Sequence, residues 1–195
     1  MCTLFLFILY VLFEVNYFIR VISILLIGKL WYREKYNVAD EFISYGICTF
    51  NDLDMFLHMN NARYIREFEF ARSLSGMASG VWSAINKLGG GAVLSAVSVR
   101  YRRSIGLFQI FRVRTKVLYY TDKDVYFEQH METIHDNFVR AVCYGKVTFT
   151  GGVTYQEIYR YLNSSELRPS PEPSPDLKCW MEANRISSEK LRKKQ

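Results

Sequence analysis

The feature that most restricts how this chain can fold is a regular alternation of apolar and polar residues between positions 92 and 150. Four consecutive runs share this period of two, and short links at 102–108, 121–124 and 134–137 separate them. A period of two places successive side chains on opposite faces of a β-strand. Because short links join antiparallel neighbours, the pattern predicts four consecutive antiparallel strands with one apolar face.

The predicted strands have one apolar and one charged face. The apolar face comprises Val93, Val97, Val99 and Tyr101, with Ser95 among them, then Phe111, Val113, Thr115, Val117 and Tyr119, then Val125, Phe127 and Met131, then Val139, Ala141, Cys143, Val147 and Phe149. The charged face includes Arg112, Arg114 and His130. Cys143 is expected in the core, because a free cysteine behaves as a small apolar side chain. His130 is expected at the surface.

A helical segment before these strands supplies a cover for their apolar face. Asn60 or Asn61 can cap its start. Its apolar stripe runs at helical spacing to about Leu74 and consists of Tyr64, Ile65, Phe68 and Ala71. A strand-like run at 43–50 comes earlier, and a second helical stretch at 78–88 ends at three glycines. The economical packing is an α+β domain in which a curved antiparallel sheet wraps around the central helix.

The first 28 residues form an apolar leader. Positions 4–27 contain 20 apolar residues among 24, and a membrane-spanning helix needs about 20. Glu14 and Arg20 oppose insertion, and Asn16, Arg20 and Ser23 share one helical face. No basic residue precedes the run and no small-residue cleavage site follows it, which favours a membrane anchor over a cleaved signal peptide. An ordinary buried helix is the third interpretation, which a run apolar nearly all round disfavours.

Basic residues indicate the orientation of that anchor. Lys29, Arg33 and Lys35 follow the leader directly, and the positive-inside rule then leaves the remaining chain in the cytosol. The ending RKKQ resembles a dibasic retrieval signal, which is read only on the cytosolic side. The leader and tail together predict a protein of the endoplasmic-reticulum membrane with a cytosolic domain. Secretion after signal-peptide cleavage is the alternative.

Composition excludes two classes of function. The net charge of +6 comes in part from the last six residues, and no nucleic-acid-binding signature accompanies it. The cysteines at 2, 48, 143 and 179 are isolated and, with three histidines, do not complete a zinc pattern. We therefore expect no nucleic-acid partner and no metal site. After the strands, a short helix is predicted at 155–162, a proline-rich linker at 168–175 and a polar helix at 176–191.

One segment mixes charge and apolar bulk in an unusual way. NDLDMFLHMNNARY, residues 51–64, places two carboxylates, one histidine and two asparagines within ten positions. Followed by E-F-A-R at 69–72, it resembles thioesterases of the 4-hydroxybenzoyl-CoA thioesterase and acyl-ACP thioesterase type. Their pattern is Asp, a few residues, His-hydrophobic-Asn-Asn, Tyr, then Glu-x-Ala-Arg. The RYRRSI stretch at 100–105 resembles their edge after the second strand.

The resemblance covers about residues 42–152 and implies the hotdog fold. The leader, LHMNNARY and the basic tail also look like the thioesterase superfamily member six group. The chain is accordingly divided into an anchor or uncleaved signal at 1–28, a linker at 29–41, a hotdog domain at 42–153 and a C-terminal extension at 154–195. The family also implies a homodimer or higher homo-oligomer with its sites at the interface. We expect pairing through the edge strand at 93–101.

The resemblance implies roles for particular residues. Asp54 matches the general base or nucleophile, and His58 matches the histidine of the acyl-ACP thioesterases. The backbone N–H of Asn61 matches the donor that polarises the thioester carbonyl, as a helix start can. Substrate-binding roles are implied for Phe56, Leu57, Tyr64 and Phe68 along an acyl tunnel. Arg100, Arg102 and Arg103 can contact CoA phosphates, since arginine matches phosphate geometry, or can form a solvated strand end. The expected substrate is an acyl-CoA or another acyl thioester, and no cofactor is needed.

Each of these residues also has a structural interpretation. Asp54 can cap a turn, and His58 can bond to a loop carbonyl. Asn60 and Asn61 can act as helix caps and take no part in the chemistry. Asp52 can pair with Arg63 or Arg66, or face solvent.

Two departures from the family pattern keep other functions open. Phe56 stands where acyl-ACP thioesterases have a catalytic asparagine, and Leu57 stands where many bacterial relatives have glycine. An inactive hotdog that binds acyl chains or lipid is therefore the alternative to a hydrolase. A third hypothesis is an interaction scaffold that depends on dimerisation and on the C-terminal helix.

Overall fold

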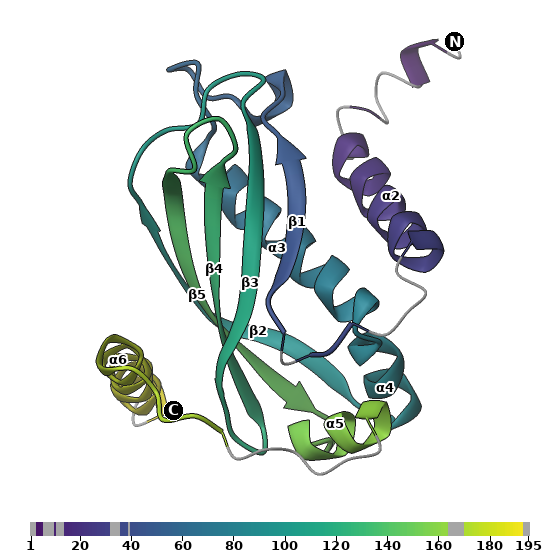
Figure 1. The fold of residues 1–195 in the computed structure, drawn as a ribbon, viewed down its shortest axis with the longest axis vertical. Helices are drawn as coiled ribbons and strands as arrows, with labels where there is room; N and C mark the ends of the chain where they lie inside the picture. The colour runs from purple at the N-terminus through teal and green to yellow at the C-terminus, as the bar shows by residue number, and fades with distance from the viewer. Residues whose placement is uncertain are drawn as a thin grey trace.

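A five-stranded antiparallel sheet organises the protein (Figure 1). The computed structural model describes residues 3–5, 10, 14–31, 36–38, 40–163 and 170–192. The strands lie in the order β1-β3-β4-β5-β2, with bounds β1 Phe42–Ile47, β2 Gly91–Tyr101, β3 Ile110–Tyr120, β4 Asp124–Thr133 and β5 Val139–Thr150. Every neighbouring pair is antiparallel. The predicted α+β architecture, a curved sheet around a central helix, is confirmed.

The central helix is α3, Asn61–Ala78, which packs against the inner face of the sheet (Figure 1). Its start is capped by Asn60, whose Oδ1 accepts the Ala62 N–H at 2.9 Å. It buries Phe68 and Ala71 in the main core. It runs past the predicted end near Leu74 until Gly80, at φ 78°, adopts the left-handed conformation that commonly ends helices.

Two shorter helices close the far end of the sheet. They are α4, Val81–Lys87, and α5, Tyr155–Asn163, as the sequence predicted. A second apolar cluster forms there and includes Ile85, Phe149 and Ile158. This cluster closes one end of the space between α3 and the sheet.

Half of the predicted apolar face is buried. Its buried members are Phe111, Val113, Thr115, Val125, Phe127, Met131, Ala141, Cys143 and Phe149. Cys143 is a core residue, as predicted. His130 lies on the outer face, where its Nε2 is 3.2 Å from Glu128 Oε1, so its predicted surface position is confirmed.

The predicted face of β2 was wrong at Val93. The pairing of β2 with β5 shifts between Leu94 and Ala96, which leaves Ser95 as an extra residue. Val93 consequently pairs with Thr148, whereas Val97 pairs with Gly145. An extra residue in a strand reverses the alternation beyond it, so Val93 faces away from the core side on which Val97 lies.

The predicted face of β3 was wrong at Tyr119 for the same reason. Its pairing with β4 shifts between Val117 and Tyr119. Tyr119 therefore lies opposite Tyr126 on the outer face, with ring centroids 5.8 Å apart. The core alternation predicted from Phe111 to Val117 holds up to this bulge.

The N-terminal helix α2, Val15–Trp31, lies beside α3 and the β1 edge (Figure 1). Arg20 Nη2 donates to Glu67 Oε2 at 2.7 Å, and Arg20 Nη1 lies 2.5 Å from Glu67 Oε1. Tyr17 Oη donates to Glu69 Oε1 at 2.9 Å. The polar side of α2 therefore faces the domain. Among the described residues, no helix is both long and apolar enough to cross a membrane.

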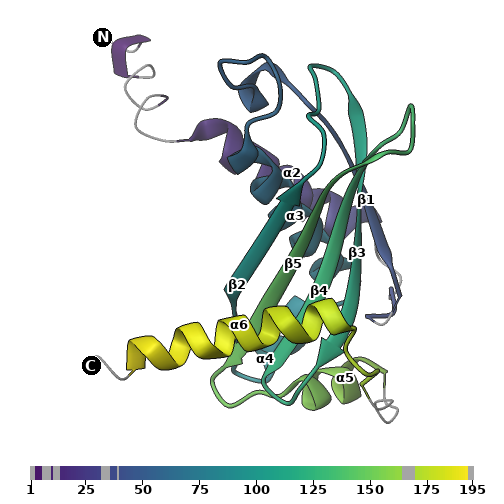
Figure 2. The same ribbon diagram turned by 90° about the vertical axis from the view of Figure 1, so that its left-hand side faces the viewer.

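The C-terminal helix α6, Pro175–Arg192, crosses the outer face of the sheet (Figure 2). Trp180 packs against Tyr126 and Tyr144 at centroid distances of 6.2 and 6.0 Å. Leu177 is 1% exposed. The predicted helix is thus present and packed on the domain. Most of positions 1–13, Arg33 and Lys35, the first two residues of the predicted proline-rich linker and the last three residues lie outside the described chain.

Candidate active site

The loop before α3 holds Asp54 in a tight turn. The Asp54 N–H donates to the His58 carbonyl at 2.9 Å, and the Leu57 N–H donates to the Asp54 carbonyl at 3.1 Å. Asp54 Oδ1 accepts the Phe56 N–H at 2.9 Å. Leu57 has a φ of 60°, which is uncommon for a residue other than glycine. One carboxylate oxygen of Asp54 therefore stabilises the loop.

The second carboxylate oxygen of Asp54 faces His58. Asp54 Oδ2 lies 3.3 Å from His58 Nδ1, although the two groups are not aligned as a hydrogen bond. The Asp54 side chain is 20% exposed, so water can reach it. A single β-bridge joins His58 to Gly106 and brings the loop after β2 to the same place. The arrangement leaves Oδ2 able to take a proton from a water molecule.

The start of α3 offers a free backbone donor beside this loop. The Ala62 and Arg63 N–H groups bond to Asn60. Within the described chain, the Asn61 N–H has no acceptor. Tyr101 Oη donates to the Asn61 carbonyl at 2.9 Å and ties the helix start to the end of β2. An unpaired N–H at the positive end of a helix suits a developing oxyanion.

Asp52 has a structural role. It is 2% exposed, and its Oδ2 accepts the N–H and the hydroxyl of Thr49, both at 2.8 Å. Its nearest cation is Arg20, whose Nη1 is 3.7 Å from Oδ1. The predicted partners Arg63 and Arg66 instead contact Glu14, so that prediction was wrong. A partner 32 positions earlier in the leader could not be read from local sequence.

The predicted substrate-binding residues fall into two environments. Phe56 and Leu57 are 71% and 75% exposed at the tip of the loop. Phe68 is 0% exposed in the core. Tyr64 is also buried, and its hydroxyl accepts the Ile105 N–H at 3.0 Å. Burial raises the pKa of Tyr64 to about 12.

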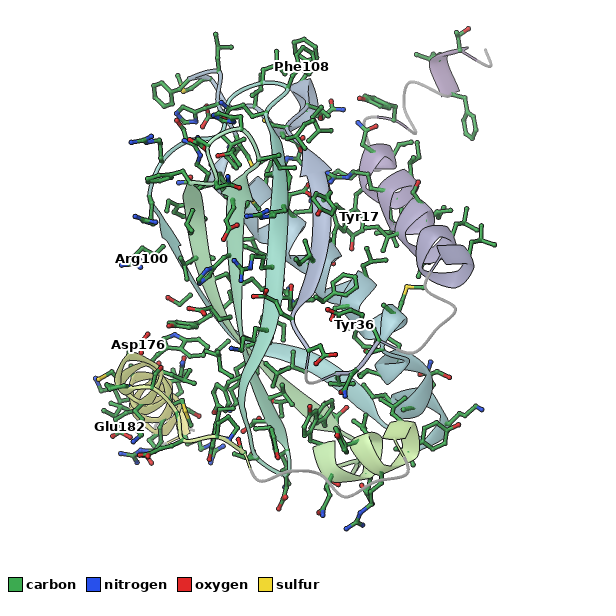
Figure 3. All side chains as sticks on the ribbon, in the orientation of Figure 1. Tyr17, Tyr36, Arg100, Phe108, Asp176 and Glu182 are labelled. Atoms are coloured by element: carbon green, nitrogen blue, oxygen red, sulfur yellow. The ribbon has the colours of Figure 1, made fainter. Side chains whose placement is uncertain are left out.

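The predicted phosphate-binding arginines are exposed at the end of β2. The guanidinium carbons of Arg102 and Arg103 lie 4.8 and 4.3 Å from the centroid of the Phe138 ring. Arg100 also projects outward from the strand (Figure 3). The substrate roles of these arginines and of the loop residues stay predictions.

A cavity of about 390 Å³ lies between α3 and the inner face of the sheet. Its apolar lining includes Ile65, Trp82, Leu94, Val117, Phe127 and Val147. The Asp54 loop does not line it. In one copy of the chain, the Asp54 loop therefore lies at the start of α3, apart from the cavity, which lies farther along the helix.

Two charged residues, Glu69 and Arg72, face this cavity, and no functional role was predicted for them from the sequence. Both line it, and they stand four and seven positions after Ile65, so one helical face carries all three. Glu69 Oε1 accepts the Tyr17 hydroxyl, and Arg72 Nη1 donates to Gln129 Oε1 at 2.8 Å. Burial lowers the pKa of Arg72. The E-F-A-R part of the motif had marked both positions, and helical spacing from Ile65 could have placed them on the cavity.

Comparison with known proteins matches residues 48–180, more than half of the chain, to the thioesterase-like superfamily. The chain belongs to this superfamily. A fruit-fly (Drosophila melanogaster) protein named "Protein THEM6" is 42% identical over 187 residues, which cover 95% of each chain. The thioesterase-like domain thus has relatives that match it along almost its whole length.

Solved structures resemble this thioesterase-like chain as well. The YbaW probable thioesterase from Escherichia coli has a TM-score of 0.53 at 16% identity, covering 65% of this chain and 99% of that one. The hypothetical protein SAV2348 from Staphylococcus aureus, in complex with CoA, has a TM-score of 0.55 at 12% identity, covering 72% and 92%. At such identities the likeness establishes the fold, which is the hotdog arrangement expected from the sequence.

Proposed function

We propose that this protein hydrolyses acyl thioesters, with acyl-CoA as the substrate class. Two observations carry the proposal: Asp54 Oδ2 lies beside His58, and the Asn61 N–H at the start of the following helix α3 has no acceptor within the described chain. The family membership and the CoA found in SAV2348 support the same substrate class.

The reaction follows from these groups. Asp54 Oδ2 takes a proton from water, and the water oxygen bonds to the thioester carbonyl carbon. The Asn61 N–H stabilises the resulting oxyanion. The carbon–sulfur bond then breaks, the thiolate leaves with the electron pair and takes up a proton, and a carboxylic acid remains. In a variant of this route Asp54 attacks the carbonyl carbon itself, and water hydrolyses the resulting anhydride.

Pairing of two chains would join the Asp54 loop to the cavity. The edge strand β2 carries partly exposed Val93, Leu94, Val97 and Tyr101, between 38% and 54% exposed. Antiparallel pairing of two β2 strands near their centres would bring the end of one strand beside the start of the other. Since Tyr101 contacts Asn61 and Leu94 lines the cavity, one copy would supply the catalytic loop and the other the acyl cavity.

We also propose that residues 1–28 attach the protein to the endoplasmic-reticulum membrane, with the domain in the cytosol. An apolar stripe on α2 points away from the domain and is 49–56% exposed at Phe18, Ile19, Ile22, Leu25 and Leu26. A helix with one apolar face can lie in the membrane interface while its polar face contacts protein.

Binding of acyl chains without turnover is the second candidate function. It is favoured by the Phe56 N–H bond to Asp54 Oδ1 and by the bulky, exposed Phe56 and Leu57 beside the carboxylate. The hydrogen bond restricts rotation of the Asp54 carboxylate, and the two bulky side chains hinder the approach of a substrate to it.

The test is hydrolysis of an acyl-CoA panel by the full-length protein and by two matched variants, Asp54→Asn and Glu69→Gln. Loss of a general base lowers the rate by roughly 10²–10⁴. We expect that loss in Asp54→Asn, with an unchanged circular dichroism spectrum. Full activity in Asp54→Asn together with loss in Glu69→Gln would transfer the chemistry to the cavity carboxylate. Binding without turnover in the unmodified protein would favour the second function.

A further inference from the structure

The cavity along α3 is lined by a cationic side chain, Arg72, to which the proposed hydrolysis assigns no role. Among the described residues that line it, Arg72 has the only positively charged side chain. The surrounding side chains are mainly apolar, including Val117, Phe127 and Val147. A charged group in apolar surroundings is costly unless it is paired, so the position of Arg72 calls for an explanation.

The position of Arg72 is fixed by a buried amide. Arg72 Nη1 donates to Gln129 Oε1 at 2.8 Å. Gln129 is 0% exposed, and its Nε2 donates to the Phe68 carbonyl at 3.0 Å and to Thr115 Oγ1 at 2.9 Å. Because both ends of the Gln129 amide are bonded, it holds the guanidinium against one wall of the cavity. The Arg72 guanidinium also lies over the Phe127 ring, 5.2 Å from its centroid.

The guanidinium keeps free donors in the cavity. An arginine has five N–H donors, and within the described chain Arg72 makes one hydrogen bond, to Gln129. No carboxylate of the described residues lies within 4.0 Å of it. The planar guanidinium matches a carboxylate by two parallel hydrogen bonds. An anion in the cavity would therefore bond to free donors of a cation that no described carboxylate contacts and on which Glu69 acts only at longer range.

We propose that this cavity binds an apolar chain that ends in a carboxylate, with the carboxylate on Arg72. A volume of about 390 Å³ lies within the range of ligand cavities, roughly 300–1,000 Å³. Two sources share this chemistry. One is a free fatty acid, such as the product of hydrolysis. The other is an acyl thioester with a second carboxylate at the far end of its chain, which rests on the proposed hydrolase function.

Substitution of Glu69 should change fatty-acid affinity in the opposite direction to substitution of Arg72. It lines the same cavity one helical turn before Arg72, and Tyr17 holds its Oε1. Its negative charge repels a carboxylate ligand without pairing directly with Arg72. Glu69→Gln should therefore strengthen fatty-acid binding, whereas Arg72→Met should weaken it.

Calorimetric titration of the full-length protein with decanoate and with decan-1-ol tests the proposal. A hydrogen bond to a charged group contributes enough for a preference of about tenfold to a hundredfold for the acid. We expect that preference in the unmodified protein and its loss in Arg72→Met. The matched control is Arg66→Met, an arginine of the same helix that contacts Glu14 and does not line the cavity.

Equal binding of acid and alcohol by the unmodified protein, or an undiminished preference in folded Arg72→Met, would overturn the proposal. If Arg72→Met does not fold, Arg72→Lys serves instead. It retains the charge and loses the two-pronged geometry, so its preference for the acid should be smaller but present.

Hydrolysis then distinguishes the two sources. If the second carboxylate of a substrate binds Arg72, decanedioyl-CoA should exceed decanoyl-CoA in kcat/KM by at least about tenfold, and Arg72→Met should abolish the difference. If the product acid is the ligand, the two thioesters react alike and decanoate inhibits both. Absence of any hydrolysis would count against the proposed function only, because the decanoate titration decides the cavity ligand independently.

Discussion

Removal of Arg20 should destabilise the protein and make its stability depend on pH. The Glu67 side chain is 5% exposed, and Arg20 from α2 is its cationic partner, with contacts at 2.5 and 2.7 Å. Breaking a buried ion pair by removing one partner costs about 3–5 kcal/mol. Arg20 is itself 36% exposed, so solvent screening reduces the expected loss in Arg20→Ala to roughly 2–3 kcal/mol.

The pH dependence follows from the Glu67 carboxyl. Burial raises the pKa of Glu67, and Arg20 opposes that rise. Without Arg20 the pKa of Glu67 in the folded protein rises further above its unfolded value of 4.5. The folded state then binds more protons than the unfolded state above that value, so stability falls as the pH rises. The deficit of Arg20→Ala should be largest at neutral pH and should shrink as the pH approaches 4.5.

Urea unfolding of the full-length protein, followed by circular dichroism at pH 7.5 and pH 5, measures both effects. A cycle of Arg20→Ala, Glu67→Gln and the double variant isolates the coupling. We expect the double variant to lose less than the sum of the singles. Ile22→Ala, on the exposed side of α2, is the control and should change little. Strict additivity, or an Arg20→Ala deficit independent of pH, would refute the docking of α2 on α3.

Three further predictions concern assembly, the C-terminal helix and topology. Val97→Lys should convert a homodimer to a monomer in sedimentation at micromolar concentration, because a charge on an edge strand opposes pairing. Leu177→Ala should lower the free energy of unfolding by about 2–5 kcal/mol, while exposed Leu191→Ala should not. The full-length protein should resist alkaline carbonate extraction, and protease added to intact microsomes should digest its C-terminus. Protection of the C-terminus would instead support a cleaved signal peptide.

The order of the elements was predictable, because it depends on local periodicity. The alternation after residue 91 gave four strands, and the apolar stripe of α3 gave the central helix. The errors at Val93 and Tyr119 have one cause. Each follows from one extra residue, Ser95 or Leu118. Ser95 is a polar exception on the predicted apolar face and Leu118 an apolar exception on the charged face, but a single exception does not identify a bulge.

The docking of the leader was only half predictable. The sequence placed Asn16, Arg20 and Ser23 on one helical face, which indicated that this face avoids lipid. It did not identify Glu67 as the partner, because that residue lies 47 positions later and is distinguished by burial alone. Ion pairs between two helices depend on how the helices pack. The 3.6-residue periodicity of one helix shows which of its faces is polar but does not identify the residue that this face contacts.

The candidate site shows the same division between local and distant structure. Asp54 and His58 lie 3.3 Å apart because one tight turn connects them, and Asn61 begins α3 three positions later, so the order of the motif places all three; their catalytic roles stay predictions. Glu69 and Arg72 were missed because a search for apolar stripes discards charged residues on the same helical face. Eight residues of helix separate Asn61 from Glu69, about 12 Å along the axis. A second copy paired through β2 would close that gap, so the effect of Val97→Lys on hydrolysis discriminates between chemistry shared across two chains and chemistry complete within one. Retention of full activity by a monomer would locate the whole reaction within a single chain.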